Sequence, residues 1–175
     1  MTLTPENKDI LTAIGISVSL ATFLYTQWKN KKINEINFAF KLMDKFDSKI
    51  LTHHRLAAAD VFLKKGFDNL QNEEWEKIDP ILDFFQEIAV FTKNGHLTPK
   101  LIWNLFFYWI GTYYYVTTKH IEETNKEYPG CWDELIWLHK KLKKIDTKIN
   151  HGKYSNHDPE SIQYFFHAES TKPTI

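Results

Sequence analysis

The chain has 175 residues, with 22 basic and 22 acidic side chains and therefore a formal net charge of zero. A neutral chain lacks the basic excess with which nucleic-acid binders neutralise phosphates. The single cysteine, Cys131, excludes an internal disulfide framework and a thiolate cluster for a metal. Aromatic residues make up 15% of the chain, which excludes a disordered protein because they supply large apolar areas to bury.

Residues 10–28 read ILTAIGISVSLATFLYTQW and carry no formal charge, although the mean hydropathy of the whole chain is -0.42. A helix of this length spans about 28 Å, close to the hydrocarbon thickness of a bilayer. Side chains suited to the membrane interface follow at its end. They are Tyr25, Trp28, Lys29, Lys31 and Lys32. We therefore predict a single transmembrane helix in the inner membrane, with residues 1–9 extracytoplasmic and the bulk of the chain cytoplasmic.

Three other interpretations of residues 10–28 remain open. A cleaved signal peptide needs a basic start, a shorter apolar core and small residues before the cleavage site, whereas Phe23, Leu24 and Tyr25 stand there in this chain. A buried core helix is an alternative, because five Ser and Thr side chains dilute the hydropathy. An interfacial helix would need a charged face, which the segment lacks. Length and flanking charge favour the anchor.

Small side chains recur at three- and four-residue spacing in this segment, so they share a face along which another helix could approach closely. They are Thr12, Gly15, Ser19, Thr22 and Thr26. The same register continues past the segment through Ile33, Ile36, Phe40 and Met43. The pattern predicts either a paired stalk or a stripe that packs on the chain's own domain, and we favour the second.

Residues 29–150 show helical periodicity and no sustained two-residue alternation, which predicts one all-α domain. The first helix is expected to continue to about Phe46. Ser48 then caps a second helix that stops at Gly66. Residues 67–78 are expected to form a polar connection, in which one helical turn around Trp75 is an alternative.

The pairs Asp79-Pro80 and Thr98-Pro99 mark the starts of two further helices, because proline suits the first helical turn. Including the closing helix of the bundle, the expected ranges are about 79–94, 99–127 and 132–149. Residues 151–175 are a polar tail, in which Asp158-Pro159 could open a short docking helix. The predicted fold class is thus a transmembrane helix that continues into a bundle of about four further helices.

The helix predicted at 99–127 carries more aromatic side chains than one buried stripe can hold. The residues that lie partly off its core face are Trp103, Phe107, Tyr108, Tyr114 and Tyr115. They could form a second packing face, a subunit interface or an aromatic groove, and the second packing face is favoured.

The histidines predict neither a metal site nor a cofactor. His53 and His54 are adjacent and point to different sides of a helix, and although His120 and Glu123 could share a face, the chain has no HExxH motif and no pair of Glu-x-x-His segments. A hydrolase that uses His53, His54 or His120 is therefore the least favoured function. Cys131 lies near a helix start, where the dipole would stabilise a thiolate. We interpret it as a small buried residue because no partner histidine is identifiable.

Arg55 is the only arginine in the chain. It lies in the second predicted helix, beside an apolar face, as Glu87 and Asp83 do in the third. A planar guanidinium binds a carboxylate at two points, so we predict an ion pair between Arg55 and Glu87 or Asp83 that orients the two helices. The alternative is solvated side chains that contribute little.

Several motifs occur together in this order. They are Arg55 followed by Ala57, Ala58 and Ala59; Phe84-Phe85-Gln86-Glu87; Gly95; Tyr108-Trp109 with Tyr113; and a closing CWDELIWLHKKL. With the N-terminal apolar helix, they make most of residues 10–145 resemble a bacterial family of small membrane-anchored helical proteins of unknown function. The resemblance implies the same architecture and supplies no reaction.

The sequence thus favours a membrane-tethered helical module that binds another protein or self-associates, without catalytic activity. Its expected partners are the lipid bilayer and a protein or a second copy of the chain, without nucleic acid or metal. The alternative is an effector that perturbs the membrane, such as a toxin or defence protein with the bundle as its sensor.

Overall fold

The computed structural model describes residues 5–68, 70–151 and 158–171, with side chains from Ile14 onward. These residues form six α-helices and no strand, so the all-α prediction is confirmed. The helices are α1 (Pro5–Phe46), α2 (Lys49–Lys65), α3 (Asn72–Lys93), α4 (Pro99–Glu127), α5 (Asp133–Asn150) and α6 (Pro159–Ser170). The chain divides into two compact units, residues 1–38 and residues 39–175.

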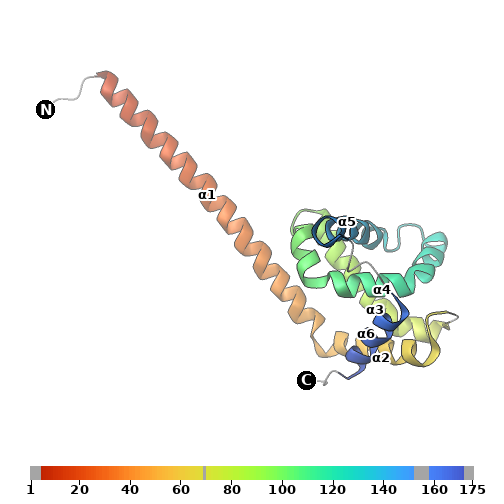
Figure 1. The fold of residues 1–175 in the computed structure, drawn as a ribbon. Coiled ribbons are helices and arrows are strands. Elements are labelled where there is room, and N and C mark those ends of the chain that lie inside the picture. The colour runs from red at the N-terminus through yellow and green to blue at the C-terminus, as the bar shows by residue number, and fades with distance from the viewer. Residues whose placement is uncertain (1–4, 69, 152–157, 172–175) are drawn as a thin grey trace. The chain divides into compact units, whose positions relative to one another are not determined.

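The first unit consists of the N-terminal part of α1, which Figure 1 shows as one continuous helix. Its large apolar side chains from Ile14 to Trp28 are all more than half exposed. Within the part of the chain that the structure describes, no helix has the length and apolar character needed to cross a membrane. Four residues of the predicted span, 10–13, lie outside the described side chains.

The ends of α2 follow from local chemistry, as predicted. The Ser48 hydroxyl accepts a hydrogen bond from the backbone N–H of Leu51 at 3.5 Å, which satisfies one of the free donors of the first turn. Gly66 ends the helix with φ of 78°, a left-handed conformation that glycine adopts without a Cβ clash. The predicted end of the first helix at Phe46 is also confirmed.

The start of α3 differs from the prediction, because the helix begins at Asn72 and not at Asp79. The Glu74 carboxylate accepts a hydrogen bond from the Gln71 backbone N–H at 2.6 Å and also pairs with Lys65. These contacts cap the first turn of α3. The helical turn considered around Trp75 is therefore the start of α3 itself. Pro80 is therefore inside the helix, where it removes one backbone hydrogen bond without ending it.

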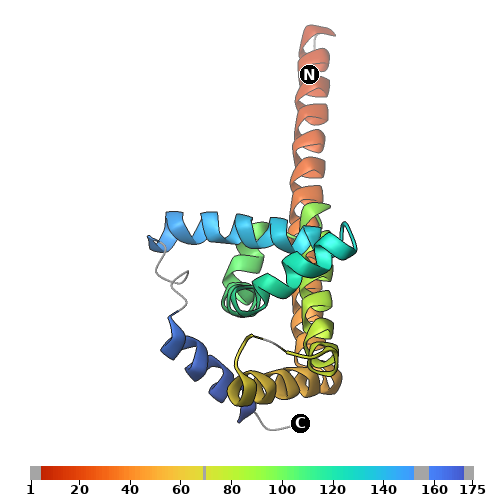
Figure 2. The same ribbon diagram turned by 90° about the vertical axis from the view of Figure 1, so that its right-hand side faces the viewer.

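The second unit is built around α2, which packs on α3 and α6, while α5 packs on α3 and α4. Figure 2 shows α6 in blue beside α2 in dark yellow. Phe46, the last residue of α1, lies at the centre of an aromatic cluster. Its ring stacks on Phe84 with centroids 5.4 Å apart. It meets Phe106 and Trp109 edge-on, with centroid distances of 5.7 and 5.4 Å. The end of α1 is thus part of the core of this unit.

The surplus aromatic side chains of α4 are used mainly for packing. Tyr114 stacks on His139 of α5 with ring centroids 3.9 Å apart, and Tyr108 meets Phe165 of α6 edge-on at 5.2 Å. Phe107 is buried. The favoured second packing face is therefore present at these three positions. By contrast, Phe40 of α1 is 59% exposed, so at this position the apolar stripe does not pack on the chain's own domain as predicted.

Candidate functional site

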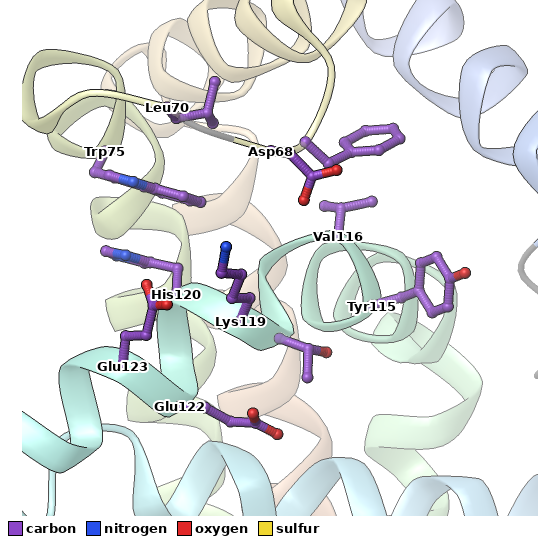
Figure 3. Close-up of a pocket in the computed structure, with 11 residues that line it drawn as sticks. Asp68, Leu70, Trp75, Tyr115, Val116, Lys119, His120, Glu122 and Glu123 are labelled. Atoms are coloured by element: carbon purple, nitrogen blue, oxygen red, sulfur yellow. The ribbon is translucent and has the colours of Figure 1, made fainter.

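A cavity of about 510 Å³ lies between the α2–α3 connection, the first turn of α3 and the C-terminal half of α4. Figure 3 shows Trp75 and His120 stacked at one side of it and Lys119 reaching toward its middle. The residues that line it are Phe67, Asp68, Leu70, Trp75, Tyr115, Val116, Thr118, Lys119, His120, Glu122 and Glu123. No sequence pattern pointed to this site, because its lining residues come from two segments, 67–75 and 115–123, that are far apart along the chain.

The imidazole of His120 is fixed in place by three contacts. Its ring is parallel to the Trp75 indole, with centroids 3.7 Å apart and an angle of 2° between the planes. Its Nε2 lies 2.9 Å from Oδ1 of Asp79, and since a carboxylate accepts, Nε2 carries the hydrogen. The ring of Trp132, the residue just before α5, packs on it at a tilted angle with centroids 5.5 Å apart. His120 therefore joins α3, α4 and α5, and is more than a solvated histidine.

Charged side chains of both signs surround this cavity. Lys119, Glu122 and Glu123 are exposed on α4, and Asp68 is exposed on the α2–α3 connection. Among the described residues no ion pair joins Lys119 to any of the three carboxylates. This lining suits a polar group of a ligand or of a partner protein better than an apolar one.

The histidines named for a hydrolase are not brought together. His53 and His54 lie side by side on α2 with ring centroids 6.1 Å apart, and only His120 lines the cavity. In the described part of the chain, no three His, Cys, Asp or Glu side chains form a group that could hold a metal ion.

Arg55 is buried, but its partners are not the predicted ones. Its Nε lies 3.6 Å from Oε2 of Glu169 on α6, and one terminal nitrogen lies 3.3 Å from the Asp47 carboxylate. The guanidinium also stacks over the Phe46 ring, 4.0 Å from its centroid. Burial, followed by the nearby Glu169 charge, raises the pKa of the Tyr113 hydroxyl beside this pair. The ion pair predicted with Glu87 or Asp83 is thus replaced by a pair with the C-terminal helix.

Three polar side chains at the Phe-Phe-Gln-Glu segment of α3 each contact a different partner. Asp83, just before it, accepts a hydrogen bond from the Trp132 indole at 2.9 Å. Gln86 accepts from the Leu135 backbone N–H at 2.8 Å, which satisfies a free donor in the first turn of α5. Glu87 pairs with Lys45 of α1. These side chains therefore connect α3 to the end of α1 and to the start of α5.

The hydroxyl groups on the small-residue face of α1 form hydrogen bonds to the backbone of the same helix. The hydroxyls of Ser19, Thr22 and Thr26 each donate to the carbonyl four residues earlier, at 2.8 Å. Such bonds satisfy a hydroxyl without water, so these residues are compatible with an apolar environment. Thr12 lies outside the described side chains, and a Cβ on Gly15 would meet nothing within 4 Å. The ring centroids of Tyr25 and Trp28 are 6.2 Å apart, and Nζ of Lys32 lies over the Trp28 ring, 5.7 Å from its centroid.

Cys131 does not have the stabilised thiolate that its place before a helix suggested. Burial raises the pKa of the thiol, and Asp83, Asp79 and Asp133 raise it further, because a thiolate would face three carboxylates. Burial is the largest of these causes of the raised pKa.

We expect iodoacetamide to alkylate Cys131 more slowly at pH 7.5 than it alkylates a cysteine in a short unfolded peptide. The rate should rise further with each increase in pH up to pH 10, and unfolding in urea should abolish the difference, because only the thiolate reacts. Mass spectrometry of timed samples measures this rate. Faster alkylation of the folded chain than of the peptide would contradict the raised pKa.

The sequence reasoning missed Glu169 and the stack of Trp75 on His120. A signal for Glu169 was present, because Ile162, Phe165, Phe166 and Glu169 follow the spacing of one helix face. No local pattern could have paired Trp75 with His120.

Comparison with known proteins gives a family but no activity. Residues 10–142 match the domain of unknown function DUF4760, which is more than half of the chain, so the chain belongs to this family. The match begins at the first residue of the uncharged segment of α1 and ends within α5. No curated protein and no solved structure matches the chain.

Proposed function

We propose that this protein is a non-catalytic helical module that is tethered to a membrane by α1 and binds a protein partner through its second unit. The observation that carries the proposal is the continuous exposure of apolar side chains on α1 from Ile14 to Trp28. A monomeric soluble protein rarely exposes so many apolar side chains in one stretch.

Several features support lipid as the surroundings of this stretch. The uncharged sequence extends N-terminally to Ile10, ahead of the first described side chain. Its Ser and Thr hydroxyls are bonded to the helix backbone, which lowers the cost of placing them in hydrocarbon. Interfacial aromatic residues and a lysine cluster end the stretch, and they orient the second unit toward the cytoplasm at the inner membrane.

The cavity beside Trp75 and His120 supports the binding role. A stacked aromatic wall adjoins exposed charges of both signs, which is the kind of surface that recognises a polar group on a partner. The ring of Tyr115 at this cavity is 52% exposed, so it is accessible from solvent.

The tether is tested by placing charges in the apolar stretch. In the variant Ile16→Lys/Leu20→Lys, insertion into a bilayer should cost about 5 kcal/mol or more. We therefore expect the wild-type chain in the carbonate-washed membrane pellet and this variant in the supernatant. The control Ile50→Lys/Tyr164→Lys adds the same charge at positions 73% and 74% exposed on α2 and α6, and should stay in the pellet. Wild-type chain recovered without detergent in the supernatant would refute the tether.

The binding role is tested separately by photo-crosslinking in intact membranes. A benzophenone amino acid in place of Tyr115 should give a discrete adduct of higher mass, and one in place of Tyr164 on α6 should not. Adducts that are absent at Tyr115 or equal at the two positions would count against the cavity as the partner-binding site.

A further inference from the structure

From Leu135 to its last residue, α5 carries a dense group of lysines and almost no acidic residue. All five of these lysines are exposed, and we call them the lysine face. They are Lys140, Lys141, Lys143, Lys144 and Lys148. The only acidic residue of the same stretch is Asp146, whose side chain is buried and accepts a hydrogen bond from Asn150 at 3.4 Å.

Helix geometry places the lysine face opposite the buried face of α5. Leu138 and Leu142 are fully buried. Each residue turns an α-helix by about 100°, so two residues of separation correspond to about 200° around the axis. Lys140 is two residues from both leucines, and Lys144 is two residues after Leu142. The lysines are therefore on the side of α5 that faces away from α3 and α4, on which the helix packs.

The charges of the lysine face are not neutralised within the described part of the chain. None of its five ammonium groups takes part in an ion pair among the described residues. The face therefore concentrates five positive charges in residues 140–148, although the net charge of the whole chain is zero. Such a concentration of one sign creates a local positive potential that attracts an anionic partner.

The residue types indicate a broad anionic surface as that partner. An ammonium group is a compact point charge without the planar fork with which arginine grips a single carboxylate or phosphate. Trp137 is partly exposed and shares one stripe with Lys141, Lys144 and Lys148, at spacing i, i+4, i+7 and i+11. Tryptophan beside lysine is typical of protein surfaces at the bilayer interface, where the ring lies at the level of the headgroups.

We propose that the lysine face of α5 binds the anionic headgroups of a lipid bilayer and so holds the second unit at the membrane. The proposal rests on the tether by α1, because the tether keeps lipid headgroups at a high effective concentration around this unit. A lysine at an anionic lipid surface strengthens binding by about fivefold, so the effects of several lysines multiply. The neutral net charge disfavours nucleic acid as the anionic partner.

Lysine acetylation of the full-length chain in lipid nanodiscs tests this contact. One kind of disc contains phosphatidylcholine alone, and the other also contains about 30% phosphatidylglycerol, an anionic lipid. We expect an uncharged acetylating ester to modify the lysine face at least about threefold more slowly in the anionic disc, by mass spectrometry of timed samples. Lys49, which is exposed on α2, should react equally in both discs. Salt at about 1 M should abolish the difference, because it screens the charges.

Two outcomes of this measurement would overturn the proposal. One is an equal reaction rate of the lysine face in the two discs, with the chain inserted in both. The other is protection that appears only when RNA is added in place of the anionic lipid, which would assign the face to nucleic acid.

A matched pair of triple variants separates the lysine face from the overall charge of the chain. The first variant is Lys140→Gln/Lys144→Gln/Lys148→Gln. The control replaces three exposed lysines that form no ion pair among the described residues, and it is Lys49→Gln/Lys77→Gln/Lys100→Gln. Both lose the same charge, so a difference between them reports the position of the lysines.

Binding of the two triple variants is compared in the untethered full-length chain, which carries Ile16→Lys/Leu20→Lys. Sedimentation with vesicles that contain about 30% phosphatidylglycerol should show about hundredfold weaker association for the first triple variant than for the control. Equal association of the two would overturn the proposal, because the attraction would then not depend on the lysine face. Since this comparison does not use the tether, a failure of α1 to anchor the chain is observed separately from a failure of α5 to bind lipid.

Discussion

Replacing Phe46 with alanine is expected to lower the free energy of unfolding by about 4 kcal/mol. The ring is 3% exposed and contacts Phe84, Phe106 and Trp109, and the Arg55 guanidinium lies over it. Its removal leaves a cavity among rigid aromatic neighbours that cannot collapse around it. It also exposes one face of a buried cation. Urea unfolding followed by circular dichroism in detergent measures the change.

A matched control is available on the same helix. Phe40 is 59% exposed, so Phe40→Ala should change the free energy of unfolding by less than about 0.5 kcal/mol. Equal losses for the two variants would show that the end of α1 does not belong to the core of the second unit.

Replacing Glu169 with glutamine is expected to cost about 3 kcal/mol, although the two side chains have nearly the same shape. The substitution removes the charge that compensates buried Arg55, and among the described residues it leaves only the exposed Asp47 carboxylate within ion-pair distance. The comparison is Glu87→Gln, which breaks a partly exposed pair with Lys45 and should cost at most about 1 kcal/mol.

A double variant separates charge from packing at this site. Arg55→Met/Glu169→Met removes both buried charges and keeps apolar volume, so it should recover most of the stability that Glu169→Gln loses. If the double variant is less stable than Glu169→Gln, the contacts of the two polar side chains outweigh the cost of burying them, and the argument from uncompensated charge fails.

The candidate site shows how far local patterns reach. The sequence singled out Arg55 as one half of an ion pair between helices, because it is the single arginine and lies beside an apolar face. It misassigned the partner to Glu87 or Asp83, since helix periodicity gives the face of a residue but not which helix packs on that face. It described residues 151–175 as a polar tail in which Asp158-Pro159 could open a short docking helix. That helix is α6, and its Phe165 and Phe166 are buried in the core.

The sequence by itself determined the all-α class, the C-terminal end of α1, both ends of α2 and the start of α4. These features depend on interactions within a few residues, such as the Ser48 cap, the left-handed Gly66 and the proline at the first turn of α4. Only the tertiary structure decided that Glu169 pairs with Arg55 and that Trp75 stacks on His120. Each of these contacts joins helices that are distant along the chain, so it depends on how the helices pack, and no spacing within one helix encodes it.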